Sequence, residues 1–73
     1  MSNLIWNSTL DEIYDCQVTR IDERTGLLKV TNSETKSVLL EKTVGLSYGS
    51  VFGPDIADVA QWQELAVNAV DNQ

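Results

Sequence analysis

The spacing of the apolar residues changes once along this chain, and that change constrains the fold more than any other feature. Between Ile13 and Val44, apolar residues largely alternate with polar ones, which is the period of half-buried strands. After Gly53-Pro54 they recur at steps of three and four, which is the period of an amphipathic helix. Strands followed by a single helix predict an α+β domain.

Three strands are predicted in the first part of the chain, over residues 13–21, 27–31 and 37–44. Polar turns at 22–26 and 32–35 separate them, and Gly26 is expected to take a positive φ at the end of its turn. The period places these residues inward: Tyr14, Cys16, Val18, Leu28, Val30, Val38 and Leu40. Three short strands predict a small antiparallel meander, with a barrel-like sheet as the alternative.

Two segments admit more than one interpretation. Residues 4–10 fit an edge strand, a short helical turn with Thr9 and Glu12 as a capping box, or an irregular tail within residues 1–11. Residues 45–53 carry three glycines and fit either a loop or a short fourth strand around residues 50–52. The sheet is therefore expected to have three or four strands.

The C-terminal helix is predicted over residues 54–70. Pro54 suits the first helical turn, and Asp55 and Asp58 favour the positive end of the helix dipole. The apolar stripe expected to pack on the sheet is Ile56, Val59, Ala60, Ala66, Val67 and Val70, widened on one side by Trp62, Leu65 and Ala69.

The length of 73 residues predicts one domain, near the lower size limit for independent folding. No apolar run approaches the roughly 18 residues of a membrane span, so no membrane association is expected. The first ten residues lack the pattern of a secretory signal. The single cysteine, Cys16, fits a reducing compartment, and we expect a cytoplasmic protein.

Catalysis, metal binding and cofactor binding are not expected. The chain has no histidine, and Cys16 is predicted to be a buried, unreactive strand residue. Asp55 and Asp58 are interpreted as dipole complements, and the acidic group of Asp11, Glu12 and Asp15 lacks the pattern of a calcium loop.

The charge of the chain is −6 and it is unevenly distributed. All five basic residues lie between positions 20 and 42, while the flanking segments carry only acids. An acidic total disfavours nucleic acid as a partner, because phosphate binding needs a basic surface.

The function that these observations favour is a small non-enzymatic module that binds another protein or itself. Large aromatic residues often anchor interfaces, so Tyr48, Phe52 and Trp62 are predicted interface residues, with a core position as the alternative for Trp62. The sequence favours neither a homodimer nor an outside partner. Two other hypotheses are a nucleic-acid-facing module using a mixed-charge sheet, and an acidic decoy of nucleic acid.

Overall fold

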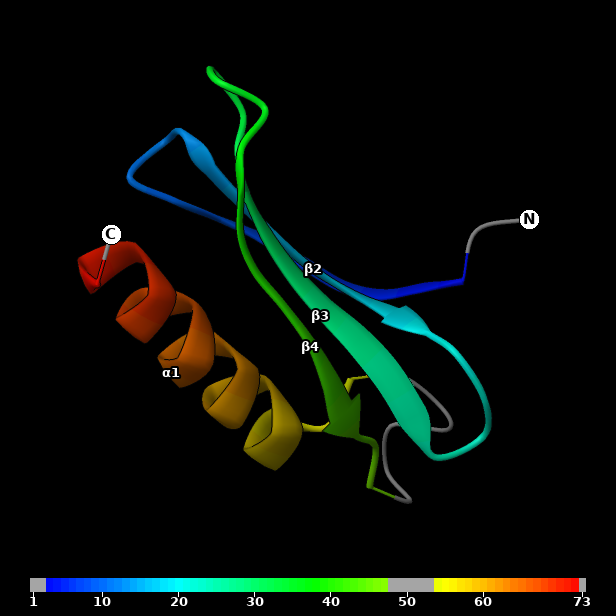
Figure 1. Cartoon of the computed structure of the whole chain (residues 1–73). Coiled ribbons are helices and arrows are strands. Elements are labelled where there is room, and N and C mark those ends of the chain that lie inside the picture. Colours follow the sequence, from blue (N-terminus) through cyan, green and yellow to red (C-terminus); the bar gives the residue numbers. More distant parts are fainter. Residues whose placement is uncertain (1–2, 48–53, 73) are drawn as a thin grey trace.

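A computed structural model describes residues 3–47 and 54–72 of the chain. Four strands are followed by one helix: β1 (Leu4–Leu10), β2 (Tyr14–Arg20), β3 (Thr25–Asn32), β4 (Val38–Gly45) and α1 (Ile56–Asp71). Each strand pairs antiparallel with the next, in the order β1-β2-β3-β4 (Figure 1). The predicted α+β meander with a C-terminal helix is confirmed. The sheet is open, so the barrel-like alternative is wrong.

Strand β1 supplies the fourth strand, so the edge-strand interpretation of residues 4–10 is confirmed. The helical turn capped by Thr9 and the irregular tail are both wrong. A bulge changes the register between the pairs Leu4↔Thr19 and Trp6↔Val18, leaving Ile5 as the extra residue. Ile5 and Trp6 consequently both pack against the core, which breaks the alternation that marks a strand in a sequence. The predicted strand around residues 50–52 lies outside the described residues.

The two central strands carry the core. Cys16 and Val18 of β2, with Leu28 and Val30 of β3, are fully buried on the face that meets the helix. Their predicted inward orientation is confirmed. This orientation follows from the period of two, because alternate side chains of a strand point to the same face of the sheet. Both central strands present one face to the helix.

Gly26 occupies a strand position where space is short. It pairs with Arg20 and Val44 within β3, and its φ is not in the left-handed region, so the predicted positive φ is wrong. A Cβ atom there would lie 3.0 Å from Val18 Cγ1 and 3.2 Å from the Thr19 carbonyl oxygen. Close packing, not turn geometry, is therefore the reason that glycine suits this position.

Strand β4 contains a second bulge, between the pairs Val30↔Leu40 and Thr31↔Val38. The extra residue, Leu39, moves Val38 to the opposite face, where it is 50% exposed. The predicted inward orientation of Val38 is wrong for this reason. Leu40 does pack against the core, as predicted.

Helix α1 begins after Asp55, which is the N-cap residue and accepts a hydrogen bond from the Ala57 N–H at 2.9 Å. Pro54 therefore precedes the cap and does not occupy the first helical turn as predicted. Asp58 accepts from the Ser47 N–H at 2.9 Å, which ties the helix to the chain that follows β4. At the other end, the Asn72 side chain donates to the Asn68 carbonyl at 2.8 Å.

The buried face of α1 is centred on Trp62 and Ala66, both fully buried. Val59, Leu65 and Val70 border this face and pack against the core. Ile56 is 88% exposed, Val67 is 38% exposed and Ala60 is also exposed, so their predicted packing on the sheet is wrong. Apolar residues cover more of the helix than the sheet can bury, and Trp62, the largest side chain, sets which part faces inward.

We predict that Ala66→Asp abolishes the cooperative thermal unfolding transition, because it places a charge between Cys16 and Val30. The matched substitution Ile56→Asp changes the free energy of unfolding by less than about 0.5 kcal/mol, since that side chain is exposed. Circular dichroism during heating measures both. A native-like transition in Ala66→Asp, or loss of the transition in Ile56→Asp, would show that the helix packs through another face.

The turn between β1 and β2 holds two non-glycine residues in the left-handed region. Asp11 has a φ of 50° and Glu12 a φ of 66°, and the Ile13 N–H donates to the Leu10 carbonyl at 3.2 Å. This is the pattern of a type I′ turn, which asparagine followed by glycine adopts most readily. Each left-handed non-glycine residue costs roughly 1 kcal/mol or more.

We predict that replacing Asp11 by Asn and Glu12 by Gly raises the free energy of unfolding by about 1 kcal/mol. The control is the same exchange at Asp22 and Glu23 in the β2–β3 connection, where neither residue has a positive φ. There the glycine lowers the free energy of unfolding by about 0.5–1 kcal/mol through its conformational entropy. Urea denaturation compares the two double variants, and equal effects would contradict the account of the turn.

Candidate protein-binding surface

One side of α1 exposes a line of residues that includes its uncovered apolar side chains. Ile56, Ala60, Gln63 and Val67 are separated by four, three and four residues, and all four are exposed. At about 100° per residue, they fall within about 60° of one another around the helix axis. We call these four residues the α1 flank. An exposed apolar line of this kind suits contact with another protein more than contact with water.

The surroundings of the α1 flank are acidic. Residues 43–73 contain Asp55, Asp58, Glu64 and Asp71 and no basic residue, which gives a local charge of 0 − 4 = −4. The last turn of the helix also lacks the basic residue that would complement its dipole. The flank is therefore apolar with an acidic border.

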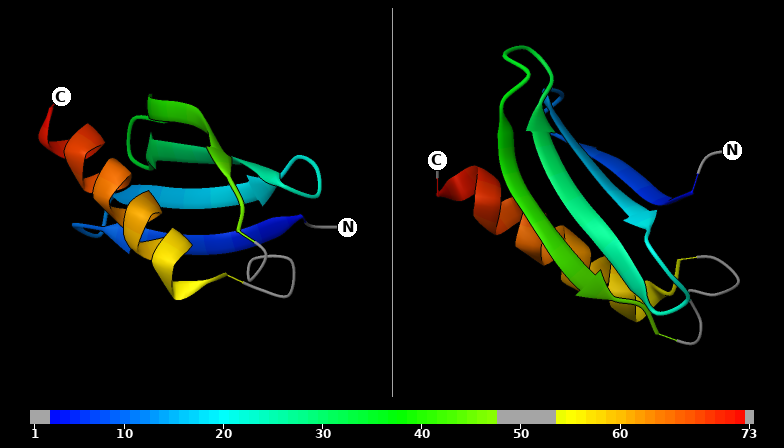
Figure 2. Two further views of the ribbon diagram at one scale, coloured as in Figure 1. Left: turned by 90° about the horizontal axis from the view of Figure 1, so that it is seen from below. Right: turned by 45° about the vertical axis from the view of Figure 1, so that its right-hand side comes forward.

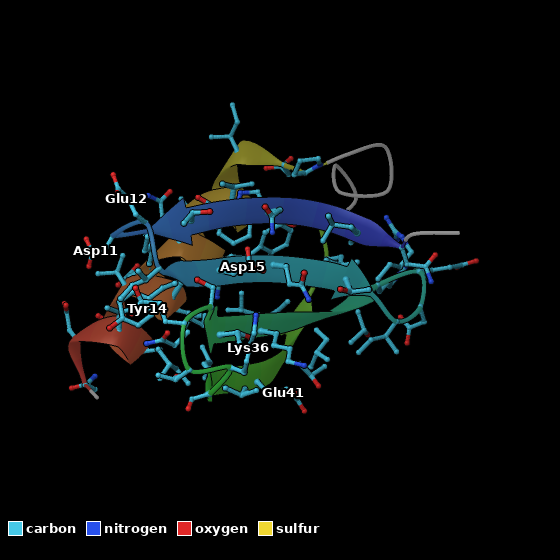
Figure 3. The ribbon with its side chains drawn as sticks, turned by 90° about the horizontal axis from the view of Figure 1, so that it is seen from above. Asp11, Glu12, Tyr14, Asp15, Lys36 and Glu41 are labelled. Atoms are coloured by element: carbon cyan, nitrogen blue, oxygen red, sulfur yellow. The ribbon has the colours of Figure 1, made fainter. Side chains whose placement is uncertain are left out.

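The exposure of Ile56 follows from the position of the helix over the sheet. Helix α1 crosses the strands diagonally. Its first turn projects beyond β1 in the left view of Figure 2 and in Figure 3, which look onto the sheet from opposite sides. Ile56 is the first residue of α1 and lies on this projecting part. It also lies about 80–120° around the helix axis from Ala66 and Trp62, which face the sheet, so the sheet does not bury it.

Strand β1 forms the edge of the sheet at this place. Its partner is β2, and no other described strand pairs with it. The sequence of β1, LIWNSTL, has no charged residue and no proline. Natural edge strands usually carry such groups, which discourage pairing with another chain.

The outer face of the sheet, opposite the helix, is polar. The Asn7 side chain donates to Asp15 Oδ1 at 3.0 Å and to the Cys16 carbonyl at 3.2 Å. Lys29 and Glu41 on this face form an ion pair at 4.0 Å. Such a face is ordinary for an antiparallel sheet with one side in water.

The basic residues are spread over the molecule. Arg20 and Arg24 lie at the β2–β3 connection, and Lys36 lies at the opposite end of the sheet in the β3–β4 connection. Lys29 forms the ion pair described above, and Lys42 lies on strand β4. This distribution gives no continuous basic surface for a phosphate backbone.

The acidic residues near the β1–β2 turn do not converge. Asp11 and Glu12 point away from the end of the sheet, whereas Asp15 lies on its outer face (Figure 3). Within residues 3–47 and 54–72, no group of three acidic, histidine or cysteine side chains is arranged to hold a metal ion.

Cys16 is fully buried, as predicted. Burial, and then the neighbouring negative charge of Asp15, raises the pKa of the Cys16 thiol above its ordinary value. The raised pKa keeps the reactive thiolate scarce at neutral pH. The predicted lack of reactivity of Cys16 stays a prediction.

Of the three predicted interface residues, only Trp62 lies in the described part of the chain. Trp62 is 0% exposed, which confirms the alternative interpretation that it is a core residue. Its side chain is therefore not accessible at the surface. Tyr48 and Phe52 lie outside the described residues. Sequence reasoning missed the exposure of Ile56, and it did not single out the edge of β1 as a binding surface. The uncharged run from Leu4 to Leu10 was the signal that pointed to an unprotected edge.

Comparisons of the chain with protein-family models, with curated proteins and with solved structures found no match. Among the described residues, no helix is both long enough and apolar enough to cross a membrane.

Proposed function

We propose that this chain is a small non-enzymatic module that acts by binding another protein. The observation that carries the proposal is Ile56, which is 88% exposed at the start of a well-formed helix. Burying an isoleucine side chain is worth roughly 1.5–3 kcal/mol. A partner that covers Ile56 gains this free energy without any change in the fold.

Several features support binding over catalysis. The chain has no histidine, its one thiol is buried, and Asp55 and Asp58 each accept a hydrogen bond from a backbone N–H. The spread of the basic residues argues against the nucleic-acid hypothesis. The module is proposed to act in the cytoplasm, since a single buried cysteine suits a reducing compartment.

The proposal is tested by placing a photo-crosslinking amino acid at position 56 in cells that carry the gene. Position 68 is the control, because Asn68 is exposed on another side of the same helix. We expect a crosslinked protein of defined mass from position 56 and none from position 68.

Recovery of only the uncrosslinked chain from both variants, or of equal amounts of adduct from both, would contradict the proposed function. An adduct that nuclease removes would favour the nucleic-acid hypothesis instead. An adduct with a mass of two chains would show that the module binds itself.

A further inference from the structure

We propose that the outer edge of β1, from Trp6 to Leu10, accepts an extended segment of a basic partner protein as an additional strand. The inference rests on the proposed binding function and specifies its surface and the chemistry of its ligand. Paired strands lie about 4.8 Å apart. An added strand would therefore lie beneath the part of α1 that projects beyond β1 (Figures 2 and 3).

The two edges of the sheet differ in their protection against pairing. Strand β4 carries Glu41 and Lys42 near its middle, and its bulge at Leu39 interrupts the ladder. In β1 the bulge lies at Ile5, and the register from Trp6 to Leu10 is regular. This part of β1 has no charge, so it is the edge where an added strand meets least resistance.

The projecting start of α1 gives the added strand an apolar surface to contact. Main-chain hydrogen bonds provide affinity when a strand is added, and every second side chain faces the same side. On the helix side of the sheet, those side chains would approach the turn that begins with Ile56. Strand addition therefore accounts for both the uncharged edge and the 88% exposure of Ile56.

The charge of the ligand follows from the segments on either side of the edge. Residues 1–19 contain Asp11, Glu12 and Asp15 and no basic residue, a local charge of 0 − 3 = −3. Residues 43–73, which include α1, carry the local charge of −4 described above. Electrostatic complementarity therefore favours a segment rich in lysine or arginine.

A second copy of the chain fits this edge less well. Antiparallel pairing of β1 with its own copy about a two-fold axis would place both helices on the same face of the joined sheet. The first turns of both helices, each with Asp55 and Asp58, would then approach one another. Two chains of charge −6 also repel each other, so the occupant is assigned to another protein.

The test uses the full chain, labelled with ¹⁵N, and a capped peptide of about eight residues in which valine and lysine alternate. A peptide of the same composition, with the valines and lysines in separate blocks, controls for charge alone. We expect the alternating peptide to bind at least about tenfold more tightly than the block peptide. It should also slow amide hydrogen exchange within residues 6–10.

Two substitutions on α1 locate the binding surface. Ile56→Lys should weaken binding of the alternating peptide by about tenfold. Asn68→Lys adds the same charge about 18 Å further along the helix and outside the α1 flank, and it should change the affinity by less than about threefold. Both side chains are exposed, so both variants are expected to fold.

Equal affinity for the two peptides, slowed exchange in β4 instead of β1, or equal effects of the two substitutions would overturn the inference. So would sedimentation of the free chain at twice its mass of 8.1 kDa with the β1 amides already protected. If position 56 crosslinks a protein in cells but the peptides bind equally, the binding function stands and strand addition is wrong. If the alternating peptide binds as expected but position 56 captures nothing, the proposed function fails and the edge remains competent to bind.

Discussion

The contact between Trp62 and Trp6 holds the helix to the sheet, and the rest of the structure depends on it. The ring centroids are 5.9 Å apart with an interplanar angle of 48°, a tilted arrangement that suits aromatic quadrupoles. A buried tryptophan covers 150–250 Å² of surface, worth roughly 4–6 kcal/mol at ~25 cal/mol per Å². Among the described residues, the buried Trp62 indole N–H has no hydrogen-bond partner, at a cost of roughly 1–3 kcal/mol. Burial therefore outweighs the unpaired donor, and Trp62 determines which face of α1 turns inward.

This orientation has consequences for the surface. With Trp62 and Ala66 on the sheet, Ile56 and Val67 are left on the exposed side of the helix. The diagonal path of α1 then carries its start beyond β1, the edge that lacks charge. The start of the exposed α1 flank therefore lies beside the uncharged edge of β1, which is the first strand of the sheet.

Much of the fold could be predicted from the sequence, because β2, β3 and most of β4 follow the period of two and α1 follows the helical period. The failures have physical causes. Bulges at Ile5 and Leu39 shift the period by one residue. The first left the strand over residues 4–10 as one of several interpretations, and the second turned Val38 to the opposite face of the sheet. Helix α1 has more apolar positions than its contact with the sheet requires, so its period could not distinguish Ile56 from Trp62. The candidate site was harder to predict. The exposure of Ile56 depends on where the helix begins relative to the edge of the sheet, and no local sequence pattern encodes that position.

The most direct test of this account is a double-mutant cycle on the two tryptophans. Trp6→Leu, Trp62→Leu and the double variant would be compared with the parent chain by urea denaturation. We expect Trp62→Leu to cost more than Trp6→Leu, because Trp62 is fully buried and Trp6 is not. The coupling free energy between the two substitutions should be about 0.5–1.5 kcal/mol. Costs that add without coupling, or a larger cost for Trp6→Leu, would contradict the claim that this contact anchors the helix.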